Sequence, residues 1–127
     1  MNQRNTLLTG VVFAGLAVAI GAFGAHGLRP LLEANGHAQT FELAVRYQFY
    51  HSFALFFCGM LMQHFPSRQI NRASMCFAAG IIIFSGSLYV LSLSGIRMLG
   101  AITPIGGLFF IAGWLLAYLG INAKRPQ

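Results

Sequence analysis

The chain has 127 residues, of which 57% are hydrophobic and 8% are charged. Charged residues make up roughly a quarter of an ordinary soluble domain, so this composition excludes a conventional water-soluble protein. The formal net charge of +6 would suggest nucleic-acid binding in a soluble chain, but the cations form no basic stripe, and we expect no nucleic-acid partner. Four charge-free windows, residues 5–28, 47–67, 73–96 and 98–123, are each long enough for the about 20 apolar residues of a membrane-spanning helix.

The first expected span covers residues 6–25 and carries small residues on one face. Gly10, Ala14 and Gly21 follow one another at steps of four and seven, which lets a second helix backbone come close. The same run also resembles a signal peptide, because a cation precedes it and small residues end it. Its uncharged part exceeds the about 7–15 residues of a signal core, so we expect a retained span.

A short interfacial helix is expected between spans 1 and 2. Pro30 is typical of a first helical position, and the pair Asn35-Gly36 is typical of a helix end. The next helix is expected to begin near Thr40, with span 2 itself at residues 43–63.

Span 2 differs from span 1 in its aromatic content and in the charges at its start. Four phenylalanines occur within residues 49–57, and we expect them to contact lipid or to fill the space opposite small residues. Glu42 and Arg46 lie four residues apart with the acid first, which is the favourable order for an ion pair on a helix. The sequence therefore predicts an ion pair where span 2 begins.

Spans 3 and 4 are expected at residues 73–93 and 104–123, and both continue the pattern of small residues. The packing seam comprises Gly80 and Ser87 in span 3, and Gly106, Gly113 and Gly120 in span 4, at steps of seven. Thr103-Pro104 is typical of a helix start, with the threonine as cap and the proline at the first helical position. Residues 94–102 then form an outer loop, a shallow re-entrant segment or part of a proline-kinked helix, and the sequence leaves these alternatives open.

Together these features predict an all-α integral membrane protein, with residues 1–127 folded as one left-handed bundle of four transmembrane helices. Small residues at steps of seven favour the left-handed crossing. The charges predict orientation, because loops rich in Lys and Arg stay in the cytoplasm. One side has Arg4, Arg68, Arg72, Lys124 and Arg125, and the other has Arg29, Arg46 and Arg97 beside the two acids, Glu33 and Glu42. We therefore expect both termini on the cytoplasmic side of the inner membrane.

Five polar residues form the candidate site: His26, Tyr47, Gln48, His51 and Tyr89. Both histidines are expected near the outer leaflet, where they could bind a metal, supply two axial ligands to a haem or relay protons. The favoured alternative is structural, with each imidazole bonded to a carbonyl and each tyrosine anchoring the interface, because two histidines are an incomplete metal set. We predict no cofactor, no metal site and no catalytic residue, since no acid lies within a span to complete a hydrolase.

Five short sequence blocks follow one another along nearly the whole chain. They are GAFGAH at 21–26, YQFYH at 47–51, FSGSLY at 84–89, TPIGG at 103–107 and AGW at 112–114. In these blocks the chain resembles the YgdD-like bacterial inner-membrane proteins, a family labelled domain of unknown function 423. The resemblance implies a multi-pass inner-membrane protein of unestablished activity, and it implies no catalytic or ligand residues.

Three hypotheses about function follow. The favoured one is a structural or accessory membrane protein that contacts membrane lipid and associates with itself or with a larger membrane complex through its small-residue faces. The second is a minimal transporter of a small solute or ion, in which His51 would carry the proton because no carboxylate lies within a span. The third is a cofactor-binding membrane protein that uses His26 and His51.

Overall fold

The computed structural model describes residues 1–123, which form helices and short connections with no strand in that range. The long helices are α1 (Gln3–Ala25), α3 (Ala38–His64), α4 (Arg68–Gly80), α5 (Gly86–Ser94) and α6 (Leu99–Asn122). A short helix, α2 (Arg29–Ala34), links α1 to α3, and a π-helical turn, η1 (Ile81–Ser85), joins α4 to α5. α4, η1 and α5 form one continuous rod, the third of four along the chain, and this third rod is also called the α4–α5 rod. The predicted all-helical class is confirmed for the described residues.

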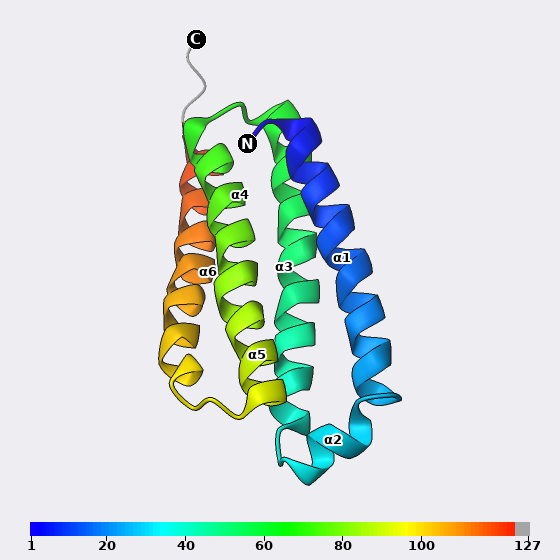
Figure 1. The fold of residues 1–127 in the computed structure, drawn as a ribbon. Helices are drawn as coiled ribbons and strands as arrows, with labels where there is room; N and C mark the ends of the chain where they lie inside the picture. The colour runs from blue at the N-terminus through cyan, green and yellow to red at the C-terminus, as the bar shows by residue number, and fades with distance from the viewer. Residues whose placement is uncertain (124–127) are drawn as a thin grey trace.

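The four rods lie side by side, with α1 at one edge and α6 at the other (Figure 1). α1 packs on α3, α3 packs on the α4–α5 rod, and α6 packs on that rod and also contacts α3. α1 and the α4–α5 rod run in one direction, whereas α3 and α6 run in the other. The core lies between α3, α4 and α6, and its most deeply buried members include Leu55, Cys58, Ile70, Ala73 and Phe77.

The turn between α1 and α3 forms as the sequence predicts. Pro30 lies in the first turn of α2, Asn35 caps its C-terminus, and Gly36 has a φ of 69°, which glycine adopts without strain. α3 begins at Ala38, two residues before the expected Thr40. This reversal places α1 and α3 antiparallel and in contact along their lengths.

The expected start of the last helix at Thr103-Pro104 is wrong. α5 ends at Ser94 with Gly95 as its C-cap at a φ of 72°, and α6 begins at Leu99, so Pro104 lies inside the helix and the connection is a short loop. A proline within a membrane helix is tolerated where neighbouring helices and Ser or Thr side chains take up the freed backbone groups. The Thr103 hydroxyl donates to the Leu99 carbonyl four residues earlier at 3.2 Å, so this residue lies within the helix and does not cap it.

The π-helical turn of the third rod was not predicted. It lies between Gly80 and Ser87, two seam residues whose seven-residue spacing assumed an unbroken α-helix. Both still face α6, because Gly80 approaches Phe110 while the Ser87 hydroxyl shares a 2.7 Å hydrogen bond with that of Thr103. The turn therefore adds one residue to the rod without separating it from α6.

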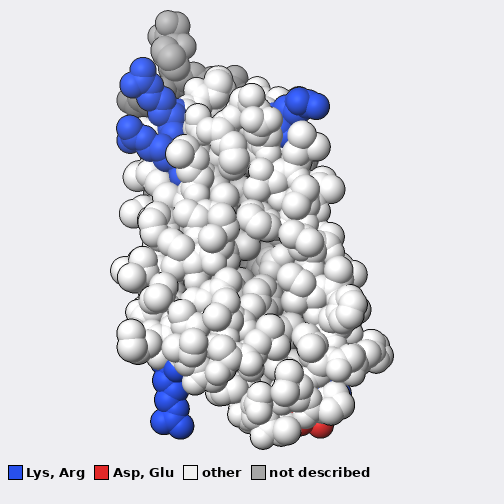
Figure 2. Space-filling view, in the orientation of Figure 1, with Lys and Arg blue, Asp and Glu red and all other residues white. Residues whose placement is uncertain are grey.

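On the face that Figure 2 shows, charged side chains gather at the two ends of the rods and the surface between them is uncharged. The predicted Glu42–Arg46 ion pair is absent from the described structure, whereas Arg29 pairs with Glu33 at 2.8 Å across one turn of α2. Glu42 and Arg46 are both exposed, so their side chains extend from α3 without holding each other. The cations at 124 and 125, which entered the prediction of orientation, lie outside the described residues.

Three of the four rods are long and apolar enough to cross a membrane by themselves: Gln3–Ala25, Arg68–Ser94 and Leu99–Asn122. α3 is also long, at 27 residues, but residues such as Gln48 and His51 lower its hydropathy. Both of these side chains are buried in the protein, at 3% and 6% exposure. α3, which has the lowest hydropathy of the long rods, therefore buries these two polar side chains against its neighbours.

Candidate functional site

Gln48 is the centre of the polar cluster and links three rods. Its amide nitrogen donates to the Phe13 carbonyl of α1 at 2.9 Å, and its amide oxygen accepts from the Tyr89 hydroxyl of α5 at 2.7 Å. The Tyr89 ring in turn packs against Phe41 of α3, with ring centroids 5.2 Å apart. The α-helical register of α3 directs Gln48 between α1 and α5, so both ends of one amide are satisfied by different helices.

His51 lies among aromatic rings from three rods. Its Nδ1 lies 2.8 Å from the Tyr47 carbonyl of its own helix, and its ring stacks on Phe110 of α6 with centroids 3.5 Å apart. Phe77 of α4 and Trp114 of α6 are also in ring contact with it. A proton-carrying role would need a path to water, and the described surroundings of this imidazole are mostly aromatic and apolar.

His51 lies halfway along α3, and its expected place near the outer leaflet stays a prediction. It is thirteen residues from Ala38 and thirteen from His64, which places it at the midpoint of α3. Tyr47 contacts the same ring, since their centroids are 5.8 Å apart. The structure thus brings together Tyr47, Gln48, His51 and Tyr89 in the middle of the protein.

His26 is not part of this cluster. It is the exposed C-cap residue of α1, whereas Gln48 meets α1 at Phe13. The thirteen residues from 13 to 26 correspond to about 20 Å of helix. A metal ion takes each ring nitrogen at about 2 Å, so His26 and His51 of one chain cannot share a metal or a haem iron. The pairing of these histidines as ligands is therefore wrong for this fold.

Two serine contacts attach the third rod to its neighbours. The Ser85 hydroxyl of η1 donates to the Ala44 carbonyl of α3 at 2.7 Å, and Ser87 bonds to Thr103 of α6. Within residues 1–123, each buried side-chain nitrogen or oxygen has a hydrogen-bond partner. No group of three or more His, Cys, Asp or Glu residues that could hold a metal occurs in this described part. The buried polar side chains therefore join the helices to one another through hydrogen bonds.

The small-residue seam also packs inside the protein. Gly10 and Gly21 of α1 approach Ser52 and Val45 of α3, while Gly106, Gly113 and Gly120 of α6 approach Phe84, Phe77 and Ile70 of the third rod. Ala14 is half-buried in α1. An added Cβ at Gly106 would lie 2.4 Å from the Phe84 backbone nitrogen, so a side chain cannot be accommodated there without displacement. The seam residues are thus engaged within one chain.

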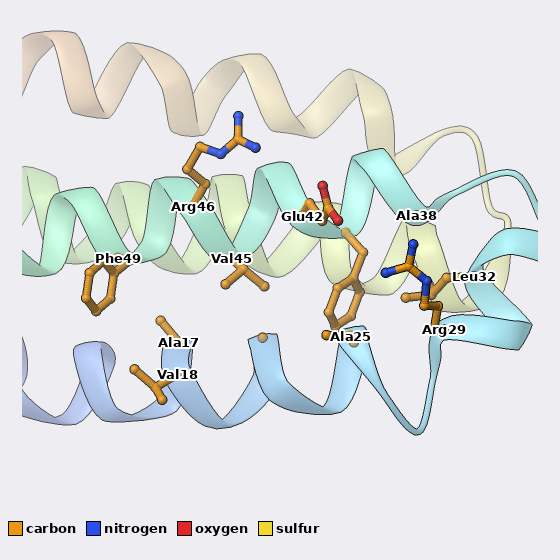
Figure 3. A pocket seen from close by; sticks show the side chains of 13 residues that line it. Ala17, Val18, Ala25, Arg29, Leu32, Ala38, Glu42, Val45, Arg46 and Phe49 are labelled. Carbon is orange, nitrogen blue, oxygen red and sulfur yellow. The ribbon is translucent and has the colours of Figure 1, made fainter.

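A groove between α1 and α3 is a second candidate site that sequence reasoning missed. Its volume is about 410 Å³, and its lining comes from α1, α2 and the first half of α3. The apolar part includes Ala17, Val18, Gly21, Val45 and Phe49, and the polar part is formed by Arg29, Glu42 and Arg46 (Figure 3). In Figure 3 the Glu42 and Arg46 side chains project from α3 on the side away from α1. The four-residue spacing of Glu42 and Arg46 predicted an ion pair, so nothing in the sequence indicated that both residues line a groove.

Comparison with known proteins identifies the family. The family described as "Protein of unknown function (DUF423)" matches residues 20–107. The UPF0382 membrane protein SH2409 of Staphylococcus haemolyticus is 46% identical over 87% of this chain and 88% of its own. YwdK of Bacillus subtilis, a UPF0382 membrane protein, is 40% identical over 87% and 89%.

The relative from Escherichia coli K12 covers nearly the whole chain. That relative is the UPF0382 inner membrane protein YgdD, which is 38% identical over 98% of this chain and 95% of the YgdD chain. No solved structure matches the chain. The match over residues 20–107 and these full-length relatives confirm the predicted family, and the chain belongs to the DUF423 membrane proteins, whose activity is not established.

Proposed function

We propose that this protein crosses the inner membrane four times, with α3 as the fourth span. The connectivity supports this, because α1 and the α4–α5 rod run in the same direction. If both cross the bilayer, the chain between them must return through it, and α3 is the helix that makes this return. Its 27 residues correspond to about 40 Å, which is sufficient for a hydrocarbon core of about 30 Å. The expected left-handed crossing of the rods stays a prediction.

The proposed orientation has both termini in the cytoplasm and α2 at the outer interface. Arg4, Arg68 and Arg72 belong to the end that also holds the start of α1 and the α3–α4 connection. α2 lies at the opposite end, where its exposed Leu31 would face headgroups. With Lys124 and Arg125, which follow α6 in the sequence, the first end has five cations against Arg29, Arg46 and Arg97 at the other, and this difference supports the orientation through the positive-inside rule.

Single cysteines introduced into a chain with Cys58→Ala and Cys76→Ala test this topology. We expect a membrane-impermeant maleimide added to intact spheroplasts to label Met98→Cys, whose side chain is 82% exposed in the native protein. Ser67→Cys, in the connection before α4, should be labelled only after the membrane is opened. Asn35→Cys, in the connection between α2 and α3, should be labelled in intact spheroplasts, and labelling of positions 35 and 67 from the same side would refute a crossing by α3.

Within this topology we propose a structural or accessory role in the membrane. The observation that carries this proposal is the hydrogen bonding of the interior: Gln48, Ser85 and Ser87 are all used to join helices. The seam glycines are likewise engaged inside one chain, so association with another protein would use the outward faces. On these faces Val12 of α1 and Ile111 of α6 are 57% and 67% exposed.

Photo-crosslinking from the outward faces tests the accessory role. A diazirine amino acid is placed at Val12 or at Ile111 in the full chain and activated in native membranes. We expect a discrete protein adduct from at least one position, either with a second copy or with another membrane protein. A buried position, Ala117, which is 2% exposed, serves as the control that should give only internal adducts. Lipid adducts alone at both outward positions would refute the proposal.

A further inference from the structure

The groove between α1 and α3 has a graded chemistry along its length. Its inner part is apolar and includes Ala17, Val18 and Phe49, while Arg46 and then Glu42 follow along α3 toward the α2 end. Arg29 closes that end, but its charge is already paired with Glu33. A ligand therefore meets an apolar surface, an unpaired cation and an unpaired anion, in that order.

Arg46 and Glu42 are free to bind a ligand. Neither makes a hydrogen bond or ion pair with another residue within 1–123, although their spacing on the helix would permit one. Arg46 is five residues from the midpoint of α3, about 7.5 Å along the axis. A cation at that depth is costly in hydrocarbon unless it extends to the interface and finds an anion.

We infer that this groove binds a phospholipid with a primary amine in its headgroup. The phosphate contacts Arg46, the ammonium contacts Glu42, and the part of one acyl chain nearest the headgroup lies against Val18 and Phe49. The order of groups in such a lipid, from chain to phosphate to amine, is the order of chemistry along the groove. The volume of about 410 Å³ lies within the range that holds small ligands, sufficient for a headgroup and part of one chain.

The charges favour a zwitterionic headgroup over an anionic one. Arg46 and Glu42 cancel each other, as do Arg29 and Glu33, so the lined site carries no net charge. An anionic lipid without an amine would satisfy Arg46 but place its negative charge beside Glu42. A choline headgroup would present methyl groups to Glu42 and could donate no hydrogen bond to the carboxylate. A primary ammonium satisfies both side chains.

Native mass spectrometry of the full chain in mild detergent tests this inference. Phosphatidylethanolamine, phosphatidylglycerol and phosphatidylcholine with identical acyl chains are offered at equal concentration, and the retained lipid is counted. We expect the ethanolamine lipid to be retained in excess of both others. Glu42→Gln should reduce this preference by about five-fold, the upper range for an exposed ion pair. Arg46→Gln should reduce retention of all three, because all carry a phosphate.

Arg97→Gln is the matched control for Arg46→Gln, since it removes the same charge from an exposed residue that lies outside the groove lining. It should leave the retention of all three lipids unchanged. Equal retention of the ethanolamine and choline lipids, or an unchanged preference in Glu42→Gln, would overturn the inference. All three substituted side chains are exposed, and an unchanged Trp114 fluorescence spectrum would show that each variant is folded.

This inference rests on the proposed four-span topology, which places the groove in the outer leaflet. The two can fail separately. Cysteine labelling that contradicts four spans, together with a retained ethanolamine preference, would overturn the topology alone. Correct labelling together with no lipid preference would overturn the lipid site alone.

Discussion

Substituting Gly106 by alanine should destabilise the protein by pushing α6 away from the third rod. The new Cβ would lie 2.4 Å from the Phe84 nitrogen and 2.7 Å from its Cα, whereas ordinary contacts begin at 3.4 Å. The nearest atoms must therefore separate by 1.0 Å, the difference between 3.4 and 2.4 Å. Both are backbone atoms, so no rotamer change relieves the overlap. Overpacking typically costs about 1–3 kcal/mol of unfolding free energy, and we expect the upper half of that range.

The neighbouring glycine provides the control. A Cβ on Gly107 would meet only the Phe84 Cδ2 atom, at 4.0 Å, which is an ordinary contact. Alanine is a better helix former than glycine by roughly 0.5–1 kcal/mol, so Gly107→Ala should be neutral or slightly stabilising. The same chemical change, one residue along the same helix, is thus expected to have opposite effects.

The assay is unfolding by SDS in mixed micelles, followed by the fluorescence of Trp114, the single tryptophan of the chain. This residue reports on tertiary structure because its ring contacts Phe77 of α4 with centroids 5.0 Å apart. We expect the midpoint of Gly106→Ala at a lower SDS fraction than that of the native protein, and that of Gly107→Ala at an equal or higher one. Indistinguishable midpoints for the two alanine variants would refute the packing of α6 on η1 described here.

Two further predictions concern the polar interior. Gln48→Leu removes hydrogen bonds to both Phe13 and Tyr89 and should lower the unfolding free energy by about 1 kcal/mol, whereas Tyr89→Phe removes one and should cost about 0.6 kcal/mol. The same SDS titration measures both, and a larger loss in Tyr89→Phe would contradict the central position of Gln48. The protein purified from haem-sufficient cells should show no Soret band, because His26 lies about 20 Å along α1 from Phe13, where the cluster of Gln48 and His51 meets that helix. A Soret band that is lost in the His51→Ala variant would contradict this prediction.

The fold was predictable to the extent that hydropathy and chain punctuation determine it. Pro30 and Asn35-Gly36 correctly predicted α2 and its end, because their backbone preferences are local. Thr103-Pro104 misled, because the same pair occurs at helix starts and inside membrane helices. The helix begins earlier, at Leu99, and no local signal in the sequence distinguishes the two uses.

The candidate site was predictable only in part. Tyr47, Gln48 and His51 share one helical segment, so their proximity followed from α-helical spacing, and Tyr89 was correctly expected at the same level. Phe110 was missed, because an apolar residue gives no signal of a stacking partner. The groove was missed because Glu42 and Arg46 at four-residue spacing suggested a pair, and only the conformations of their side chains show that both are free.

The sequence by itself determined that this is a helical membrane protein of a particular family, because composition, the length of apolar runs and sequence blocks are properties of the chain alone. Only the tertiary structure decided which faces meet. In it the seam glycines pack within one chain, the side chains of Gln48 and His51 are buried, and the groove between α1 and α3 stays open. The physical reason is that helix contacts in lipid depend on close packing and on hydrogen bonds between distant residues, and both require three-dimensional positions.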